Sequence, residues 1–250
     1  MGPSRNHTRT EVAWLAAMLA RKPDATGPNG EPLFVPLARA RLHNPLKPGR
    51  LLVVVGNRQG SAAPAVQEWY WHSVMGPVRD LAMPATLNEA GLDYGTGLAV
   101  VIGRTIHGAD ERTAGAAIAG TMVANIVRAA PLPVARDDLA GDSEFRRCLI
   151  GPSLVDAAEA PDSAALRLTT RVNGKDVQAG TTADLSWAIP RLVARLSRYG
   201  LAAGDMIVTG LLSDAQPAGT ATAPRLHAGD VLESAIEGLG MMRNRVVADA

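Results

Sequence analysis

Short apolar runs bounded by glycines are the feature of this sequence that most restricts its fold. Residues 51–55 read Leu-Leu-Val-Val-Val between Gly49 and Gly56. Runs so short and so rich in β-branched side chains indicate buried strands rather than helices. Residues 166–172 alternate in polarity, and Asn173-Gly174 after them is a hairpin turn signal. Further apolar runs stand at 100–102, 206–210 and 231–236. The pattern predicts a β-rich α+β fold.

Helical patterns are fewer. Thr8 and Glu11 have the spacing of a capping box, which predicts a helix over residues 9–22. Its apolar part, residues 12–20, is too short to cross a bilayer. Residues 114–127 show a helical rhythm of small apolar side chains, and 185–199 form an amphipathic helix pattern that ends before a glycine.

The prolines suggest where the main domain begins. Residues 23–50 contain six prolines and two glycine turns, which is typical of an extended connection. We therefore predict a helix and proline-rich arm over residues 1–50 and a main domain over 51–250.

Composition excludes several classes of function. The chain has 25 basic and 24 acidic residues and a net charge of +1, which gives no basic footprint for nucleic acid. Hydrophobic residues make up 47% of the sequence, enough for a sizeable core. The single cysteine, Cys148, allows no disulfide within the chain and is compatible with a reducing cytoplasm. We expect a cytoplasmic protein with a small-molecule substrate and no membrane or nucleic-acid partner.

Ordered motifs carry a family resemblance. Residues 92–103 read LDYGTGLAVVIG, and glycine turns follow in order at Gly151-Pro152, Asn173-Gly174, Gly204-Asp205 and Gly229-Asp230. From about residue 51 onward the chain resembles the fumarylacetoacetate hydrolase superfamily, whose core strand begins L-D-Y-E-x-E. The resemblance implies a β-sandwich roll with a central pocket, usually a homodimer. It also implies hydrolysis, decarboxylation, hydration or isomerisation of 2-oxo or 1,3-diketo acids, with the enolate held on Mg²⁺ or Mn²⁺.

The ligands of that metal are missing. The two glutamates of the family pattern are Gly95 and Gly97 here, and the third carboxylate aligns with Ile126, in the run Asn125-Ile126-Val127-Arg128. Hard divalent cations need charged oxygen ligands, which two glycines and an isoleucine do not supply. We therefore predict a chain with no metal site and no cofactor.

Other family pocket residues have changed too. The two pocket lysines align with Trp69 and near Asp142, and residues 56–64 lack the lid's histidine–glutamate dyad. These replacements remove charge and add apolar surface, so they predict a roomier, apolar cavity. The substrate contacts expected in it are Gln59, Trp69, Trp71, Gly95, Gly97, Asn125, Ile126, Thr209 and Leu211.

Three residues are candidates for catalysis. His72 could transfer protons, because histidine is the commonest general acid–base side chain, although an exposed loop histidine is an equal interpretation. Arg128 could hold an anion or carbonyl, or form a surface ion pair, which is commoner. Asp142 could act as a base if desolvated, or belong to a solvated acidic loop.

Two classes of function remain open at this point. The first is a metal-independent enzyme, a cyclase, isomerase or dehydratase of natural-product type, acting on a bulky, partly apolar carbonyl metabolite. The second is a non-catalytic binding protein or an inactive partner subunit. If the ligand positions are misaligned, the chain would instead be an ordinary metal-dependent hydrolase or decarboxylase.

Overall fold

The computed structural model describes residues 24, 26–32, 39–40, 42–59, 64–129, 145–215 and 224–249. The chain divides into two units, Met1–Arg41 and Leu42–Ala250. In the first unit, the N–H of Gly27 donates to the carbonyl of Glu31 over 2.8 Å and closes a small turn. The helix predicted over residues 9–22 lies outside the described residues. No helix in the described ranges is long and apolar enough to cross a membrane.

The second unit is built on a seven-stranded sheet with the order β2-β1-β10-β5-β6-β7-β3. Its strands are β1 Leu51–Val55, β2 Ala65–Trp69, β3 Val74–Met75, β5 Leu92–Ile102, β6 Ile118–Ala129, β7 Arg146–Asp156 and β10 Met206–Leu211. The two edge strands, β2 and β3, are separated by residues 70–73 alone, which include the 3-10 helix η2, Trp71–Ser73. So short a link forces the sheet to curl until its edges approach each other.

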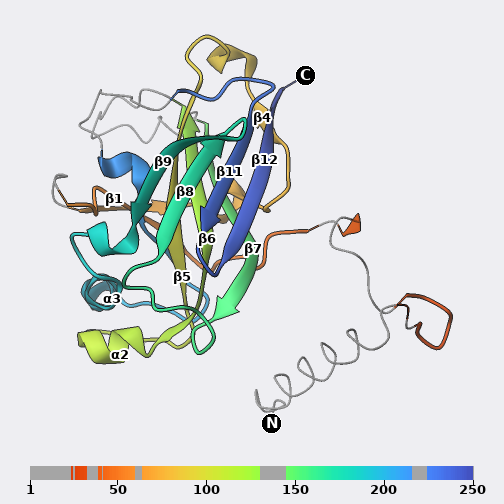
Figure 1. Cartoon of the computed structure of the whole chain (residues 1–250). Coiled ribbons are helices and arrows are strands. Elements are labelled where there is room, and N and C mark those ends of the chain that lie inside the picture. The colour runs from red at the N-terminus through yellow and green to blue at the C-terminus, as the bar shows by residue number, and fades with distance from the viewer. Residues whose placement is uncertain are drawn as a thin grey trace. The chain divides into compact units, whose positions relative to one another are not determined.

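A five-stranded sheet packs against the convex side of this curl, with the order β4-β12-β11-β8-β9 (Figure 1). Its strands are β4 Leu81–Met83, β8 Arg167–Val172, β9 Lys175–Thr181, β11 Val231–Ile236 and β12 Gly240–Ala248. The predicted hairpin between β8 and β9 is confirmed, because Asn173 and Gly174 have φ of 53° and 77°, as a two-residue turn of this kind requires.

Strand alternation produces two cores. Leu52, Val100 and Ile207 point toward the second sheet and join a large cluster that also contains the helices. Their neighbours Val101 and Val208 point into the curl and join a second cluster. Because β1, β5, β6 and β10 are buried on both faces, their sequences read as continuous apolar runs rather than alternating ones.

This double burial explains one wrong prediction. Residues 114–127, expected to be helical, belong mostly to β6, and only the short helix α2, Glu111–Gly115, precedes it. The predicted helix at 185–199 is confirmed in its later part, as α3, Ile189–Leu196, followed by the 3-10 helix η6, Ser197–Tyr199. The helices α2 and α3 lie at one end of the sheets (Figure 1). The described ranges also contain the 3-10 helices η3 Ala85–Leu87, η5 Thr182–Asp184 and η7 Leu212–Ala215.

The two Gly-Asp motifs form the same turn. Asp205 accepts from the N–H of Ala202 over 2.8 Å, and Asp230 accepts from the N–H of His227 over 2.8 Å. Asp205 is buried and also accepts from the backbone and the guanidinium of Arg50. An aspartate that closes a turn on its own backbone is a local device, which is why the sequence motif identifies it.

Candidate functional site

The three positions that carry metal ligands in the resembled family lie together on the concave face of the curled sheet. Gly95 pairs with Ile126 across β5 and β6, and Gly97 pairs with Ala124. Residues directly opposite each other in a sheet face the same side. Gly95, Gly97 and Ile126 therefore share one surface, as the alignment of the sequence requires.

The space beside the two glycines is occupied by the end of β10 and by η7. A Cβ on Gly95 would lie 3.1 Å from Leu211 Cβ and closer still to Ser213 Oγ. A Cβ on Gly97 would overlap the carbonyl oxygen of Gly210 and lie 3.2 Å from Leu211 Cδ2. The roomy cavity predicted here is therefore wrong for the described residues, because the chain itself fills the place of the lost carboxylates.

A divalent metal does not fit this face. Neither glycine has a side chain that could bind a metal, and Ile126 is buried among apolar side chains. No group of three or more His, Cys, Asp or Glu that could hold a metal ion occurs within the described ranges. The side chains at these three positions therefore supply none of the oxygen ligands that Mg²⁺ or Mn²⁺ needs.

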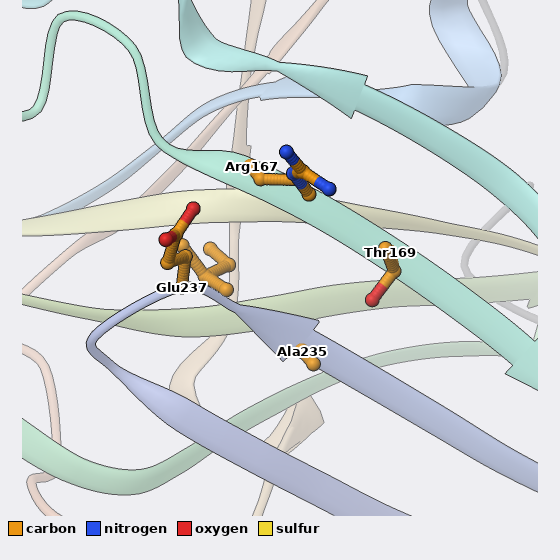
Figure 2. Close-up of a pocket in the computed structure, with 5 residues that line it drawn as sticks. Arg167, Thr169, Ala235 and Glu237 are labelled. Atoms are coloured by element: carbon orange, nitrogen blue, oxygen red, sulfur yellow. The ribbon is translucent and has the colours of Figure 1, made fainter.

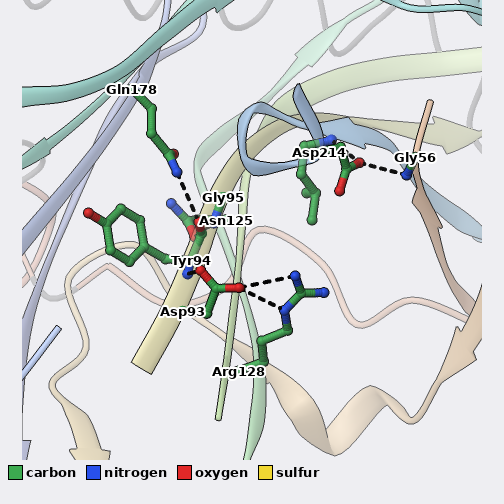
Figure 3. A network of polar contacts seen from close by, with 9 residues as sticks. Gly56, Asp93, Tyr94, Gly95, Asn125, Arg128, Gln178 and Asp214 are labelled. Atoms are coloured by element: carbon green, nitrogen blue, oxygen red, sulfur yellow. Dashed lines mark hydrogen bonds and ion pairs between the residues drawn. The ribbon is translucent and has the colours of Figure 1, made fainter. Parts of the chain in front are cut away.

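Charged groups border the same face at its mouth. Arg128, two residues beyond Ile126, donates to Oδ2 of Asp93 through Nε at 3.3 Å and Nη2 at 3.1 Å (Figure 3). Both side chains are partly exposed, at 25% and 38%. Arg146 on β7 stands directly opposite Arg128. The predicted clamp residue thus has an ion-pair partner, and a second arginine lies beside it.

Asp214 is the carboxyl held most closely by the backbone at this site. It accepts from the N–H of Gly56 at 2.9 Å and from the N–H of Leu211 at 3.0 Å (Figure 3). Burial raises the pKa of Asp214 above its ordinary value, while the two N–H donors and the charges of Arg128 and Arg58 oppose that rise. Such a carboxyl can both accept and return a proton nearer neutral pH than an exposed aspartate.

Arg58 lies in the loop after β1 and is almost completely buried. Its Nη2 pairs with Oδ2 of Asp184 at 2.8 Å, and Nη1 donates to the carbonyl of Thr181 at 3.4 Å. Its Nε has no hydrogen-bond partner in the described structure. A buried donor of this kind is where a bound group or water can be accommodated. The next residue, Gln59, is exposed and bonds to the carbonyl of Ala183 at 3.5 Å.

Two of the predicted contact residues point away from the concave face, toward the core between the two sheets. The amide of Asn125 donates to Ser234 Oγ at 2.7 Å and Thr96 Oγ1 at 3.1 Å, and accepts from the N–H of Gly95 at 3.2 Å. It thereby ties the two sheets together. Thr209 is fully buried and donates to the carbonyl of Leu98 at 3.0 Å. Their contact with a substrate stays a prediction.

Three of the remaining predicted residues lie near the edges of the curled sheet that approach each other. Trp69 is 6% exposed and belongs to the concave cluster with Ile126 and Leu211. His72 is exposed, and its ring stacks on Tyr70 with centroids 5.4 Å apart. Trp71 begins η2. Asp142 lies outside the described residues.

Sequence reasoning missed Asp214, Arg58 and Arg146. Asp214 follows directly on the altered turn after Thr209-Gly210, and Arg58 lies inside the shortened lid segment, so departures from the family pattern were an available signal. Arg146 had no such signal, because only the register of β6 and β7 sets it opposite Arg128.

A curled seven-stranded sheet with a five-stranded sheet packed on its convex side defines a mixed two-sheet β-roll. Residues 55–247 match the family model described as fumarylacetoacetate (FAA) hydrolase C-terminal. Because this match covers most of the sequence, the chain belongs to the fumarylacetoacetate hydrolase family.

Characterised relatives carry enzyme names. The chain is 29% identical over 236 residues to oxaloacetate tautomerase YisK of Bacillus subtilis, covering 84% of this chain and 74% of that protein. It is 36% identical over 168 residues to the 4-hydroxyphenylacetate degradation bifunctional isomerase/decarboxylase of Salmonella dublin, covering 65% of this chain and only 37% of that protein.

A solved structure has the same architecture. It is described as a probable 2-hydroxyhepta-2,4-diene-1,7-dioate isomerase from Mycobacterium abscessus, with a TM-score of 0.72 and 26% identity over 94% of this chain and 88% of that one. Relatives of this chain include proteins described as an isomerase/decarboxylase, a tautomerase and a hydrolase.

Proposed function

We propose that this chain is a metal-independent enzyme that moves a proton within a carbonyl acid, as an isomerase or tautomerase. The observation that carries the proposal is Asp214, a largely buried carboxyl fixed by two backbone N–H groups. It follows Ser213, whose Oγ is the atom nearest to the position of a Cβ on Gly95, where the family resemblance expects metal chemistry. Among cyclisation, dehydration and isomerisation, the relatives' names favour isomerisation.

Asp214 would act as the proton carrier. In its ionised form it removes a proton from the carbon next to the carbonyl group, the electron pair of that C–H bond forms a C=C bond, and the π pair of the carbonyl group moves onto its oxygen. The proton is then delivered to the enolate oxygen, or to another carbon of a conjugated system. Atoms and charge balance without an oxidant, and the raised pKa of Asp214 suits a group that takes up and returns a proton.

The arginines would supply the charge that a metal supplies elsewhere in the family. Arg128 and Arg58 both act on Asp214 electrostatically. Guanidinium groups in a partly buried site stabilise an enolate oxygen through charge-assisted hydrogen bonds. The unsatisfied Nε of Arg58 is a donor available for such a bond. The filled face beside Gly97 favours a compact acid over the bulky apolar metabolite expected from the sequence.

The test is keto–enol exchange of oxaloacetate, followed by ultraviolet absorbance with and without EDTA. We expect catalysis that EDTA leaves unchanged, and a fall in kcat of about 100-fold or more in Asp214→Asn, the usual weight of a general acid–base. Asp176→Asn, at an exposed residue of β9, is the matched control. Activity that requires added Mn²⁺, or full activity in Asp214→Asn, would refute the proposal.

A second candidate function is a non-catalytic binding subunit. The observation that favours it is the same filling of the face beside Gly95 and Gly97, which leaves little room for a reacting group. Saturable binding of 2-oxo acids by calorimetry, with no turnover of any of them, would support this candidate over the enzyme.

A homodimer in the cytoplasm is also proposed, from the resemblance to the family and the single buried cysteine. Light scattering of the purified chain would test the dimer, and fractionation of the producing cells would test the location.

A further inference from the structure

A small pocket lies where the two edges of the curled sheet approach each other. It has a volume of about 110 Å³ and is lined by Glu68, Trp69, Tyr70, His72, Ser73, Arg146 and Arg147. We call it the edge pocket. Because Arg146 stands directly opposite Arg128, the edge pocket adjoins the candidate site at the same mouth of the sheet. Its volume is below the roughly 300 Å³ of a complete small-molecule site, so it suits one end of a ligand.

The aromatic lining of the edge pocket suits a planar group. Trp69 is buried, and its indole N–H is fixed by Oε1 of Gln67 at 3.1 Å. Tyr70 and His72 stack with an interplanar angle of 10° and form a second flat wall. The tyrosine is 65% exposed although it is an aromatic side chain. Flat walls of this kind favour a conjugated or aromatic group by stacking.

The charges of the edge pocket favour an anion. Arg146 lies over the Trp69 ring at 5.6 Å, and Arg147 lies over the Phe145 ring at 4.5 Å. Arg147 also donates to the carbonyl of Arg146 at 2.8 Å, which holds the two residues in one arrangement. Among the described residues of the lining, Glu68 is the one carboxylate, against two arginines. Arginines stacked on rings present their N–H edges to a carboxylate.

We propose that the edge pocket binds the carboxylate end of a planar, conjugated or aromatic acid, with Arg146 as the recognition residue. As a binding site it stands independently, and as the anchor of a substrate that reaches Asp214 it rests on the proposed function. The aromatic walls then select acids whose carboxylate adjoins a flat group over saturated acids of the same length.

The first test uses three ligands of nearly the same size, measured by calorimetry with the full chain. Cinnamate carries the carboxylate and the conjugated plane, cinnamamide lacks the charge, and 3-phenylpropanoate lacks the planarity. We expect cinnamate to bind, cinnamamide to bind at least about ten-fold more weakly, and 3-phenylpropanoate to fall between them. Equal affinity for cinnamate and cinnamamide, or no binding of cinnamate, would overturn the proposal.

Variants locate the binding. Arg146→Gln should weaken cinnamate binding about ten-fold or more, and Tyr70→Ala, at an exposed position, should weaken it about three-fold. The control is Arg167→Gln, in a larger hollow of about 360 Å³ on the outer side of the second sheet, lined also by Thr169, Ala235 and Glu237 (Figure 2). Loss of binding in Arg167→Gln alone would move the site to that hollow and refute the edge pocket.

The two proposals fail separately. Asp214→Asn should bind cinnamate like the wild type, because Asp214 does not line the edge pocket. If Asp214→Asn keeps full turnover while cinnamate binding still depends on Arg146, the proposed function falls and the edge pocket stands. If Arg146→Gln does not fold, as circular dichroism would reveal, Tyr70→Ala and the ligand series decide the outcome.

Discussion

Adding one methyl group at Gly97 tests whether the place of the lost metal ligand is filled. In a strand, Gly→Ala at an unobstructed position stabilises a protein by about 0.4–1 kcal/mol, because the unfolded chain loses freedom. Here the new Cβ would overlap the carbonyl oxygen of Gly210 and lie 3.2 Å from Leu211 Cδ2. Overpacking of this kind costs about 1–3 kcal/mol. Open space beside Gly97 would therefore make Gly97→Ala stabilising, whereas filled space would make it destabilising.

The obstacle at Gly95 is a side chain rather than backbone. Ser213 Oγ and Leu211 Cβ stand nearest to its added Cβ. We expect Gly95→Ala to destabilise as well, and Ser213→Gly to recover part of that loss in the double variant. No single side-chain truncation should rescue Gly97→Ala, since the overlapping atom belongs to the main chain.

The assay is urea unfolding followed by tryptophan fluorescence, with the midpoint and slope compared among the variants. Gly115→Ala is the matched control, because its Cβ would find only Pro190, at 3.7 Å, and should leave stability unchanged or raised. A higher midpoint for Gly97→Ala would refute the reasoning, since it would mean open space beside the glycine. A lower midpoint with an unchanged slope is the expected result.

Three further predictions concern buried polar groups. Asn125→Ala should lower the free energy of unfolding by about 2–4 kcal/mol, against about 1 kcal/mol for Ser234→Ala. The reason is that Asn125 makes three buried hydrogen bonds, and its loss leaves their partners unsatisfied. Chemical unfolding measures both variants, and equal losses would contradict this. Asp205→Ala should cost about 3–5 kcal/mol, since it leaves the guanidinium and backbone N–H of Arg50 and the turn N–H of Ala202 without their acceptor; a thermal melt within about 2 °C of wild type would contradict it. Burial raises the folded pKa of Asp214 above its unfolded value of about 3.9, so its protonated form contributes stability that is full below about pH 4 and is lost as pH rises through the folded pKa. Asp214→Asn should remove that decline in unfolding measured from pH 4 to 7, and parallel curves for the two proteins would argue against the raised pKa.

Local patterns determined much of the fold from the sequence alone. The hairpin at Asn173-Gly174 and the turns at Asp205 and Asp230 depend on backbone conformations and hydrogen bonds within a few residues, so the motifs identify them directly. The strand β6 was misread as a helix because small apolar side chains buried on both faces carry no period of two.

The candidate site divides in the same way. The family resemblance predicted Gly95, Gly97 and Ile126 as the altered ligand positions, and strand register sets them side by side. The sequence interpretation placed both Asn125 and Ile126 in the pocket. Neighbouring residues of a strand, however, point to opposite faces of the sheet. That alternation sends the amide of Asn125 toward the second sheet and leaves Ile126 in the concave core.

What fills the site was decided only by tertiary structure. From the family resemblance, the sequence predicted that the carboxylates were lost and that empty space stood in their place. The space is taken by Leu211 and Ser213, which come from a segment far along the chain that reaches β5 through the pairing of β10. Asp214 belongs to the same segment, and Arg146 lies beside Arg128 because β7 pairs with β6. The residue types can be read from the sequence, but which of them meet depends on strand pairing between distant segments, and no local pattern encodes it.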